Sequence, residues 1–161
     1  EAARRSMAAV KYKNRREYLD FYSQAMVSRY GKWLSHIRPD ALVPVPVHPA
    51  RRRKRGFNQA EELAERISLL TGIPVRADLL IRIRKTLPQK ELNPAERLNN
   101  LRLAFAVSDF YKIHPDQLPE RVVLADDIYT TGSTMEACTR VLKEAGVKQV
   151  YVMSVCIGKG R

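Results

Sequence analysis

The chain has 161 residues, of which 45% are hydrophobic and 29% are charged, a composition that is ordinary for a globular protein of one domain. No apolar run approaches the ~20 residues that a transmembrane helix needs, and the first residues lack the pattern of a secretory signal. We therefore exclude a membrane-spanning protein and expect a single domain over residues 1–161.

The net charge of +12 is unevenly distributed. Residues 1–55 hold 14 Lys and Arg against 4 Asp and Glu, a net charge of +10, and they begin with a basic segment, residues 1–16. Residues 56–161 carry a net charge of only +2. Such a block suggests a polyanionic partner, either nucleic acid or a phosphorylated metabolite, although many basic proteins have neither.

The first half of the chain predicts two helices separated by a strand. Apolar residues recur at helical spacing over residues 17–37, and this stripe favours a core face over a base-stacking surface. The apolar run 41–47 predicts a short buried strand, and the basic run 51–56 follows it. An amphipathic helix then begins at the capping residue Asn58 and ends before Gly72.

The next part of the chain predicts strands separated by polar segments. Residues 79–84 and 101–107 predict strands. Between them, residues 85–100 predict a long flexible loop with one short helical turn that starts at Asn93. Residues 108–120 predict another loop.

The last part predicts a strand at 121–125, a helix at 133–145 and a strand at 149–157. Because strands alternate with helices, we expect an α/β fold with a mostly parallel central sheet flanked by helices. Ligands of such sheets bind beyond the carboxyl ends of the strands. The basic run, the polar loop and an Asp-Asp pair all follow predicted strands.

The two cysteines, Cys138 and Cys156, both lie in apolar patterns. No C-x-x-C motif occurs, so the sequence gives no argument for a zinc site. We expect buried, reduced thiols and a cytoplasmic protein.

Asp126 and Asp127 stand side by side where the strand 121–125 ends. Adjacent carboxylates repel each other and are costly to desolvate, so they need water, a cation or sugar hydroxyls near them. A vicinal diol offers two donors, and Mg²⁺ prefers oxygen ligands. The alternative is a solvated turn without a ligand.

The segment Thr130–Thr134, with the sequence TTGST, follows the pair and enters the next helix. Backbone amides around Gly132, hydroxyl groups of Thr130, Thr131, Ser133 and Thr134, and the positive end of the helix dipole together predict a phosphate-binding turn. A capping box of Ser133 with Glu136 is the alternative. The lysine and glycine spacing of a P-loop is absent.

The whole stretch VVLADDIYTTGST, residues 122–134, resembles the phosphoribosyl pyrophosphate (PRPP) signature of type I phosphoribosyltransferases. The resemblance implies the type I phosphoribosyltransferase fold, with a flexible hood loop. It also implies that Asp126 and Asp127 bind the ribose hydroxyls and that Thr130, Thr131, Gly132, Ser133 and Thr134 bind the 5-phosphate.

A second resemblance covers about residues 8–157. The stretch VPVPVHPARRRKRGFNQAEELAERI, residues 43–67, and the later spacing of Thr86, Gln89, Leu92, Arg97 and Asn100 resemble the ComF family of competence-associated phosphoribosyltransferase-like proteins. Many members of this family carry a zinc ribbon ahead of this domain. The ribbon is absent here, and since the chain does not begin with methionine, it either lies upstream or is lacking.

These resemblances imply a site for PRPP with Mg²⁺. Asp126 and Asp127 are the candidate catalytic and Mg²⁺-linked residues, with the metal held directly, through water or by PRPP. Arg51 and Arg55 are candidates for the pyrophosphate, since arginine suits phosphate oxygens. The loop 85–100 resembles the hood, in which Thr86, Gln89 and Arg97 are candidate contacts. We expect His48 to be a structural residue or a weak phosphate contact, and not a general base.

Three functions stay open. The first is a competence protein that binds PRPP and single-stranded DNA, with Arg51, Arg52, Arg53, Lys54 and Arg55 on the nucleic acid and other competence proteins as partners. The second is an active phosphoribosyltransferase that moves phosphoribose to a nucleobase or an amine. The third is a non-catalytic regulator that responds to PRPP. A homodimer is also left open.

Overall fold

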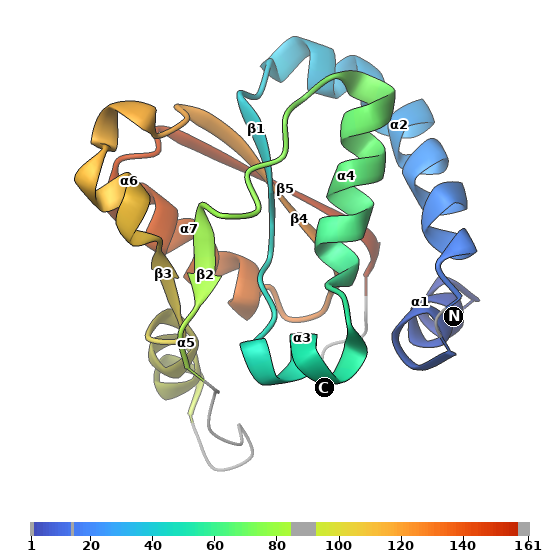
Figure 1. Cartoon of the computed structure of the whole chain (residues 1–161), viewed down its shortest axis with the longest axis horizontal. Coiled ribbons are helices and arrows are strands. Elements are labelled where there is room, and N and C mark those ends of the chain that lie inside the picture. Colours follow the sequence, from blue (N-terminus) through green and yellow to red (C-terminus); the bar gives the residue numbers. More distant parts are fainter. Residues whose placement is uncertain (1, 14, 85–92, 158–161) are drawn as a thin grey trace.

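The computed structural model describes residues 2–13, 15–84 and 93–157. A three-stranded parallel sheet with the order β1-β4-β5 forms its centre, and a two-stranded antiparallel sheet of β2 and β3 lies beside it (Figure 1). The elements are α1 (Ala2–Lys13), α2 (Glu17–Ile37), β1 (Ala41–Pro44), α3 (Pro49–Arg55), α4 (Gln59–Thr71), β2 (Leu80–Arg82), α5 (Pro94–Arg102), β3 (Phe105–Val107), α6 (Asp109–Ile113), a 3-10 turn (Pro115–Gln117), β4 (Arg121–Tyr129), α7 (Ser133–Ala145) and β5 (Gln149–Ile157).

The register of the central sheet brings β4 into the middle. Ala41 of β1 lies opposite Val122, and Arg121 at the start of β4 lies opposite Gln149 of β5. Because all three strands run in the same direction, their carboxyl ends lie at one edge of the sheet. This edge is where the sequence predicts a ligand.

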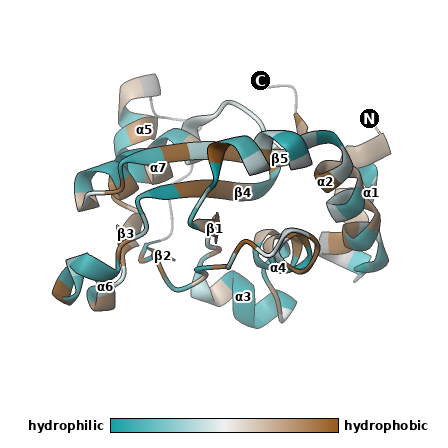
Figure 2. Cartoon of the chain, turned by 90° about the horizontal axis from the view of Figure 1, so that it is seen from above, coloured by the Kyte–Doolittle hydropathy of each residue, from teal (hydrophilic) through white to brown (hydrophobic). Residues whose placement is uncertain are grey.

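The two faces of the sheet carry separate apolar clusters, as the alternation of strand side chains requires. Val122 and Leu124 pack with α7 and the β2–β3 pair on one face. Val123 and Ala125 pack with α1, α2 and α4 on the other. Figure 2 shows α4 and α7 on opposite sides of β4, so both faces of the sheet are covered by helices.

The predicted α/β class is confirmed, and several boundaries differ. The strand predicted at 101–107 is wrong over its first residues, because α5 continues to Arg102 and β3 covers only Phe105–Val107. Asn93 and Glu96 form a reciprocal capping box that starts α5, so the helix has a strong beginning and extends for nine residues. The predicted loop 108–120 contains α6 and the 3-10 turn.

Candidate functional site

The aspartate pair lies on β4 just beyond the end of β1. Pro44, the last residue of β1, pairs with Ala125, whereas Asp126 has only Ser154 of β5 as a strand partner. The Asp127 side chain is 7% exposed and Asp126 is half-buried. A carboxylate oxygen of Asp126 accepts a 2.8 Å hydrogen bond from the Asp127 backbone N–H, which fixes the first carboxylate against the chain.

The regular alternation of β4 breaks at this pair. Val123 and Ala125 belong to the cluster under α4, so a regular strand would turn Ile128 to the opposite face. Ile128 nevertheless packs against that same cluster, and Tyr129 packs against the other one. The alternation rule therefore does not force the two carboxylates to opposite faces of the sheet.

The turn Thr130–Thr134 joins β4 to α7 through a residue in the left-handed region. Gly132 has φ +81° and precedes the first residue of α7. The Thr131 and Ser133 hydroxyl groups lie 2.9 Å apart, and both side chains reach the protein surface at least in part. The Ser133 N–H, the first of the helix, donates to the Thr131 hydroxyl at 3.4 Å, and Gly132 has no side chain that could cap the amides that follow.

The alternative of a capping box at this turn is wrong. Gly132, not Ser133, is the residue ahead of the helix, and Ser133 is already its first residue. The Glu136 carboxylate instead accepts a 2.8 Å hydrogen bond from Arg140, one helical turn further on.

The basic run forms the short helix α3 on the same edge of the sheet. Arg51, Arg52, Arg53 and Lys54 are exposed and Arg55 is half-buried. Arg52 pairs with Glu61 at 2.8 Å. His48 accepts a hydrogen bond from the Ala50 N–H at 3.2 Å, so it caps α3, as the expected structural role requires.

Asn58 caps the next helix, α4, and ties the segment just after α3 to the core. Its side-chain amide donates to the Val45 carbonyl at 3.0 Å, and its oxygen accepts from the Ala60 N–H at 3.1 Å. The side chain is 5% exposed, so both bonds form in a dry environment. Arg16, from the segment ahead of α2, lies over the neighbouring Phe57 ring at 4.3 Å. The exposed arginines thus stand on a rigid base.

Arg82 at the end of β2 is a site residue that the sequence reasoning missed. Burial lowers the pKa of its guanidinium, and the nearby Arg51 lowers it further, while Cys138 and Asp126 act in the opposite direction. Arg82 therefore lies near enough to Arg51 of the basic helix and to Asp126 to interact with both charges. The LLIRIR pattern could have indicated Arg82, because two arginines alternate with apolar residues at the end of this strand, next to the polar loop.

The two cysteines differ in burial. Burial raises the pKa of the Cys138 thiol, and the negative charge of Asp126 adds to the effect. Cys138 is buried as predicted, whereas Cys156 is half-buried.

The described residues hold no group of three His, Cys, Asp or Glu that would bind a metal by themselves. Two carboxylates fit a Mg²⁺ ion that takes most of its oxygen ligands from a phosphorylated ligand.

Of the three predicted hood residues, one belongs to an element that the structure describes. Thr86 and Gln89 lie outside the described residues, and Arg97 belongs to α5. Within the predicted loop, α5 begins at Pro94. The roles of these three residues stay predictions.

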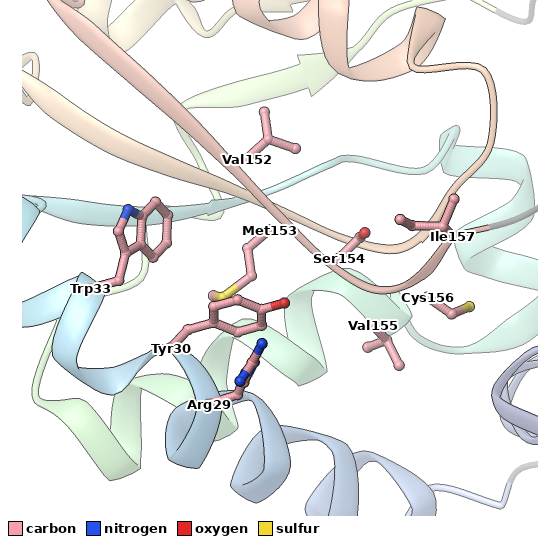
Figure 3. A pocket seen from close by; sticks show the side chains of 9 residues that line it. All are labelled: Arg29, Tyr30, Trp33, Val152, Met153, Ser154, Val155, Cys156 and Ile157. Atoms are coloured by element: carbon pink, nitrogen blue, oxygen red, sulfur yellow. The ribbon is translucent and has the colours of Figure 1, made fainter.

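Cavities in the described part of the chain include one beside β5 and a smaller one beside β2. The larger, of about 660 Å³, runs between α2 and the outer edge of β5, and Figure 3 shows Arg29, Tyr30 and Trp33 facing that strand. None of the predicted site residues lines it. The smaller, of about 290 Å³, lies between α3 and β2, and Arg52, Arg53 and Arg82 contribute to its wall.

Comparison with known proteins gives a consistent picture. Residues 53–161 match the family model of the phosphoribosyl transferase domain. Competence protein F of Haemophilus influenzae is 34% identical over 115 residues, which are 71% of this chain and 48% of that protein. Competence protein ComFC of Streptococcus pneumoniae is 36% identical over 114 residues, 71% of this chain and 46% of that protein.

The DNA utilization protein YhgH of Escherichia coli K12 is 31% identical over 121 residues, 73% of this chain and 49% of that protein. The chain therefore spans about half the length of these relatives. Among solved structures, purine phosphoribosyltransferase of Pyrococcus horikoshii has a TM-score of 0.48 at 16% identity, covering 83% of this chain and 71% of that one. Within the described residues, no helix has the length and apolar character to span a bilayer.

Proposed function

Because the chain belongs to the phosphoribosyl transferase domain family, within its ComF branch, we propose that it binds PRPP at the carboxyl edge of the parallel sheet. The observation that carries the proposal is the turn between β4 and α7, where a helix amino terminus without a side-chain cap and two hydroxyl groups follow two carboxylates. Helix amino termini of this kind bind phosphate groups. The 5-phosphate would bind at Thr130–Thr134.

The ribose would bind at the aspartate pair. Asp126 and Asp127 would accept hydrogen bonds from its hydroxyl groups, and the preorganised Asp126 carboxylate loses little freedom on binding. When bound with PRPP, Mg²⁺ would offset charge on the pyrophosphate. Arg51 and Arg55 would hold that pyrophosphate, and residues 85–100 would cover it.

The relatives suggest a role in natural competence. Their names refer to competence and to DNA utilization. We extend this role to the chain, with single-stranded DNA on the basic helix α3, other competence proteins as partners and a cytoplasmic location. The exposure of Arg51 to Lys54 supports the DNA contact, because cationic surfaces follow nucleic-acid backbones.

Catalysis would use the same site. A nitrogen of an amine or a nucleobase would attack C1 of the ribose, and the bond from C1 to the pyrophosphate oxygen would break, so that its electron pair leaves with pyrophosphate. Asp126 or Asp127 would stabilise the positive charge that develops on the ring and accept the proton from the nitrogen. A protein that binds PRPP without this step would be a regulator.

Calorimetry with PRPP and Mg²⁺ tests the binding proposal. We expect Asp126→Asn and Asp127→Asn each to weaken binding by about tenfold or more, because hydrogen bonds to a charged group contribute ~1.5–3 kcal/mol. Asp116→Asn, at an exposed aspartate of the 3-10 turn, is the matched control and should bind as the wild type does. Equal affinity of all four proteins would refute the site.

Turnover is measured separately. Release of pyrophosphate from PRPP with a panel of amines and nucleobases would support the transferase. Absence of release from a protein that binds PRPP would support the regulator.

A further inference from the structure

The cleft of about 290 Å³ between α3 and β2 has a cationic wall that the PRPP site does not use. Arg52 and Arg53 contribute from α3, and Arg82 contributes from β2. Figure 1 shows that α3 follows β1 and that β2 lies beside β1, so residues far apart in the sequence meet here. The remaining wall includes the apolar side chains of Pro49 and Ile81.

The Arg82 guanidinium is held in a fixed position on this wall. Its central carbon lies 5.3 Å from the centre of the Phe105 ring, on the neighbouring strand β3. Arg82 pairs with Phe105 across the two strands, so the backbone and the ring together orient the planar group. A preorganised guanidinium offers two parallel donors to phosphate oxygens.

The charges around the cleft favour an anion. Arg51 and Arg82 are close enough for their repulsion to lower the pKa of Arg82, and Arg53 adds a third, exposed cation. Glu61 pairs with Arg52, and the negative charge of Asp126 partly offsets the effect of Arg51 on Arg82. Bringing like charges together at a partly buried position costs free energy, and a bound phosphate group would offset that cost.

We infer that the cleft between α3 and β2 binds a backbone phosphate of a single-stranded nucleic acid through Arg53 and Arg82. This inference rests on the proposed DNA role and assigns it a location. The seven-residue helix α3 is about 10 Å long. Charges on one strand of a duplex are ~3.4 Å apart along the axis, and those of an extended single strand are farther apart, so the helix faces no more than about three phosphates and the cleft receives one.

Binding of a fluorescent oligo(dT) across a salt series tests the inference. Each lost phosphate contact should make the slope of log K against log salt shallower by about 0.7, which is about fivefold in affinity at 0.1 M salt. We expect this change for Arg53→Gln and for Arg82→Gln. Arg82→Lys should retain part of the affinity, since it keeps the charge but loses the planar fork.

The matched control is Arg121→Gln. Arg121 begins β4 at the opposite end of the sheet, so this variant loses the same charge far from the cleft. Its oligo(dT) affinity should stay within twofold of the wild type. Since Arg53 is exposed on a helix surface, its variant keeps the test valid even where Arg82→Gln folds poorly.

Two small probes separate this inference from the PRPP proposal. PRPP and ribose 5-phosphate should bind Arg53→Gln as they bind the wild type, because Arg53 is exposed on α3 and is not among the residues proposed to contact PRPP. A loss of PRPP affinity in Arg82→Gln with unchanged oligo(dT) binding would assign the cleft to pyrophosphate and overturn the inference. Absence of oligo(dT) binding by the wild type at low salt would also overturn it, while PRPP calorimetry would still judge the PRPP site.

Discussion

Replacing Gly132 by alanine perturbs the phosphate turn in two ways that the structure separates. The backbone at Gly132 has φ +81°, a region that residues with a side chain adopt at a cost. A Cβ atom there would also collide with the Tyr129 side chain, whose Cζ atom would lie at 2.9 Å. Tyr129 is half-buried and packs against the core cluster under α7, so a displacement of the ring would disturb that packing.

The two effects have different magnitudes. The left-handed backbone costs an alanine about 1–2 kcal/mol. Crowding in a packed region adds about 1–3 kcal/mol. Gly72→Ala is a matched control, because Gly72 has φ +76° and open space where the Cβ would stand. We expect the control to lose only the first contribution to the free energy of unfolding, and Gly132→Ala to lose both.

Urea unfolding measures this difference. Trp33 is the only tryptophan in the chain and packs edge-on against Tyr151, so its fluorescence reports the core. Replacing Tyr129 by valine removes the colliding ring atoms and should recover part of the loss in Gly132→Ala. Ribose 5-phosphate affinity should fall in Gly132→Ala and not in the control. Equal destabilisation by the two substitutions would refute the crowded geometry of the turn.

Three further outcomes follow from charges and burial. The Cys138 thiol, whose pKa burial raises, should react with a thiol reagent at pH 8 much more slowly than Cys156 in the folded protein and equally fast in guanidinium. Arg66→Gln should reduce the free energy of unfolding by about 1 kcal/mol, and by less in 1 M salt. The substitution removes the 2.6 Å ion pair with Asp20 of α2 and the 2.8 Å ion pair with Glu62 of α4. Burial, with Asp78 nearby, raises the pKa of Tyr111 above its ordinary value of 10.0. The stability that the neutral hydroxyl contributes is therefore complete below about pH 10 and is lost as the pH rises through the folded-state pKa. In Tyr111→Phe, the urea midpoint should change less between about pH 9 and 11 than it does in the wild type.

The sequence predicted elements well where local pattern and tertiary packing agree. The helix at 133–145 and the strand at 149–157 have the predicted bounds. The strand prediction failed at residues 101–103 because Leu101, Leu103 and Phe105 alternate as in a strand, whereas the helix that Asn93 caps continues to Arg102 and has Leu103 as its C-cap. Leu101 lies on that helix and is buried in the core. A buried leucine at this position fits a strand pattern as well as a helix pattern, so the packing of the neighbouring elements determines which of the two forms.

The candidate site was predictable in its contiguous part only. Asp126 to Thr134 are neighbours in sequence, so the strand, the turn and the helix start could be inferred from one motif. Arg82 comes from a different sheet, and nothing in its local pattern states that β2 lies against α3. Its place beside Arg51 and Asp126 depends on how the β2–β3 pair packs on the main sheet.

This arrangement links the two proposed ligands. Arg82 interacts with Asp126, a predicted ribose ligand, and lines the cleft inferred for nucleic acid. A ligand on the Asp126 carboxylate changes the charge that faces the guanidinium, and a phosphate in the cleft changes the charge that faces Asp126. Coupling between two binding sites is reciprocal. If PRPP changes the affinity for oligo(dT) by some factor, oligo(dT) must change the affinity for PRPP by the same factor, whether that factor is above or below one. Since Arg82 is the shared residue, Arg82→Gln should reduce that factor towards one, whereas Arg53→Gln, which affects the cleft alone, should preserve it.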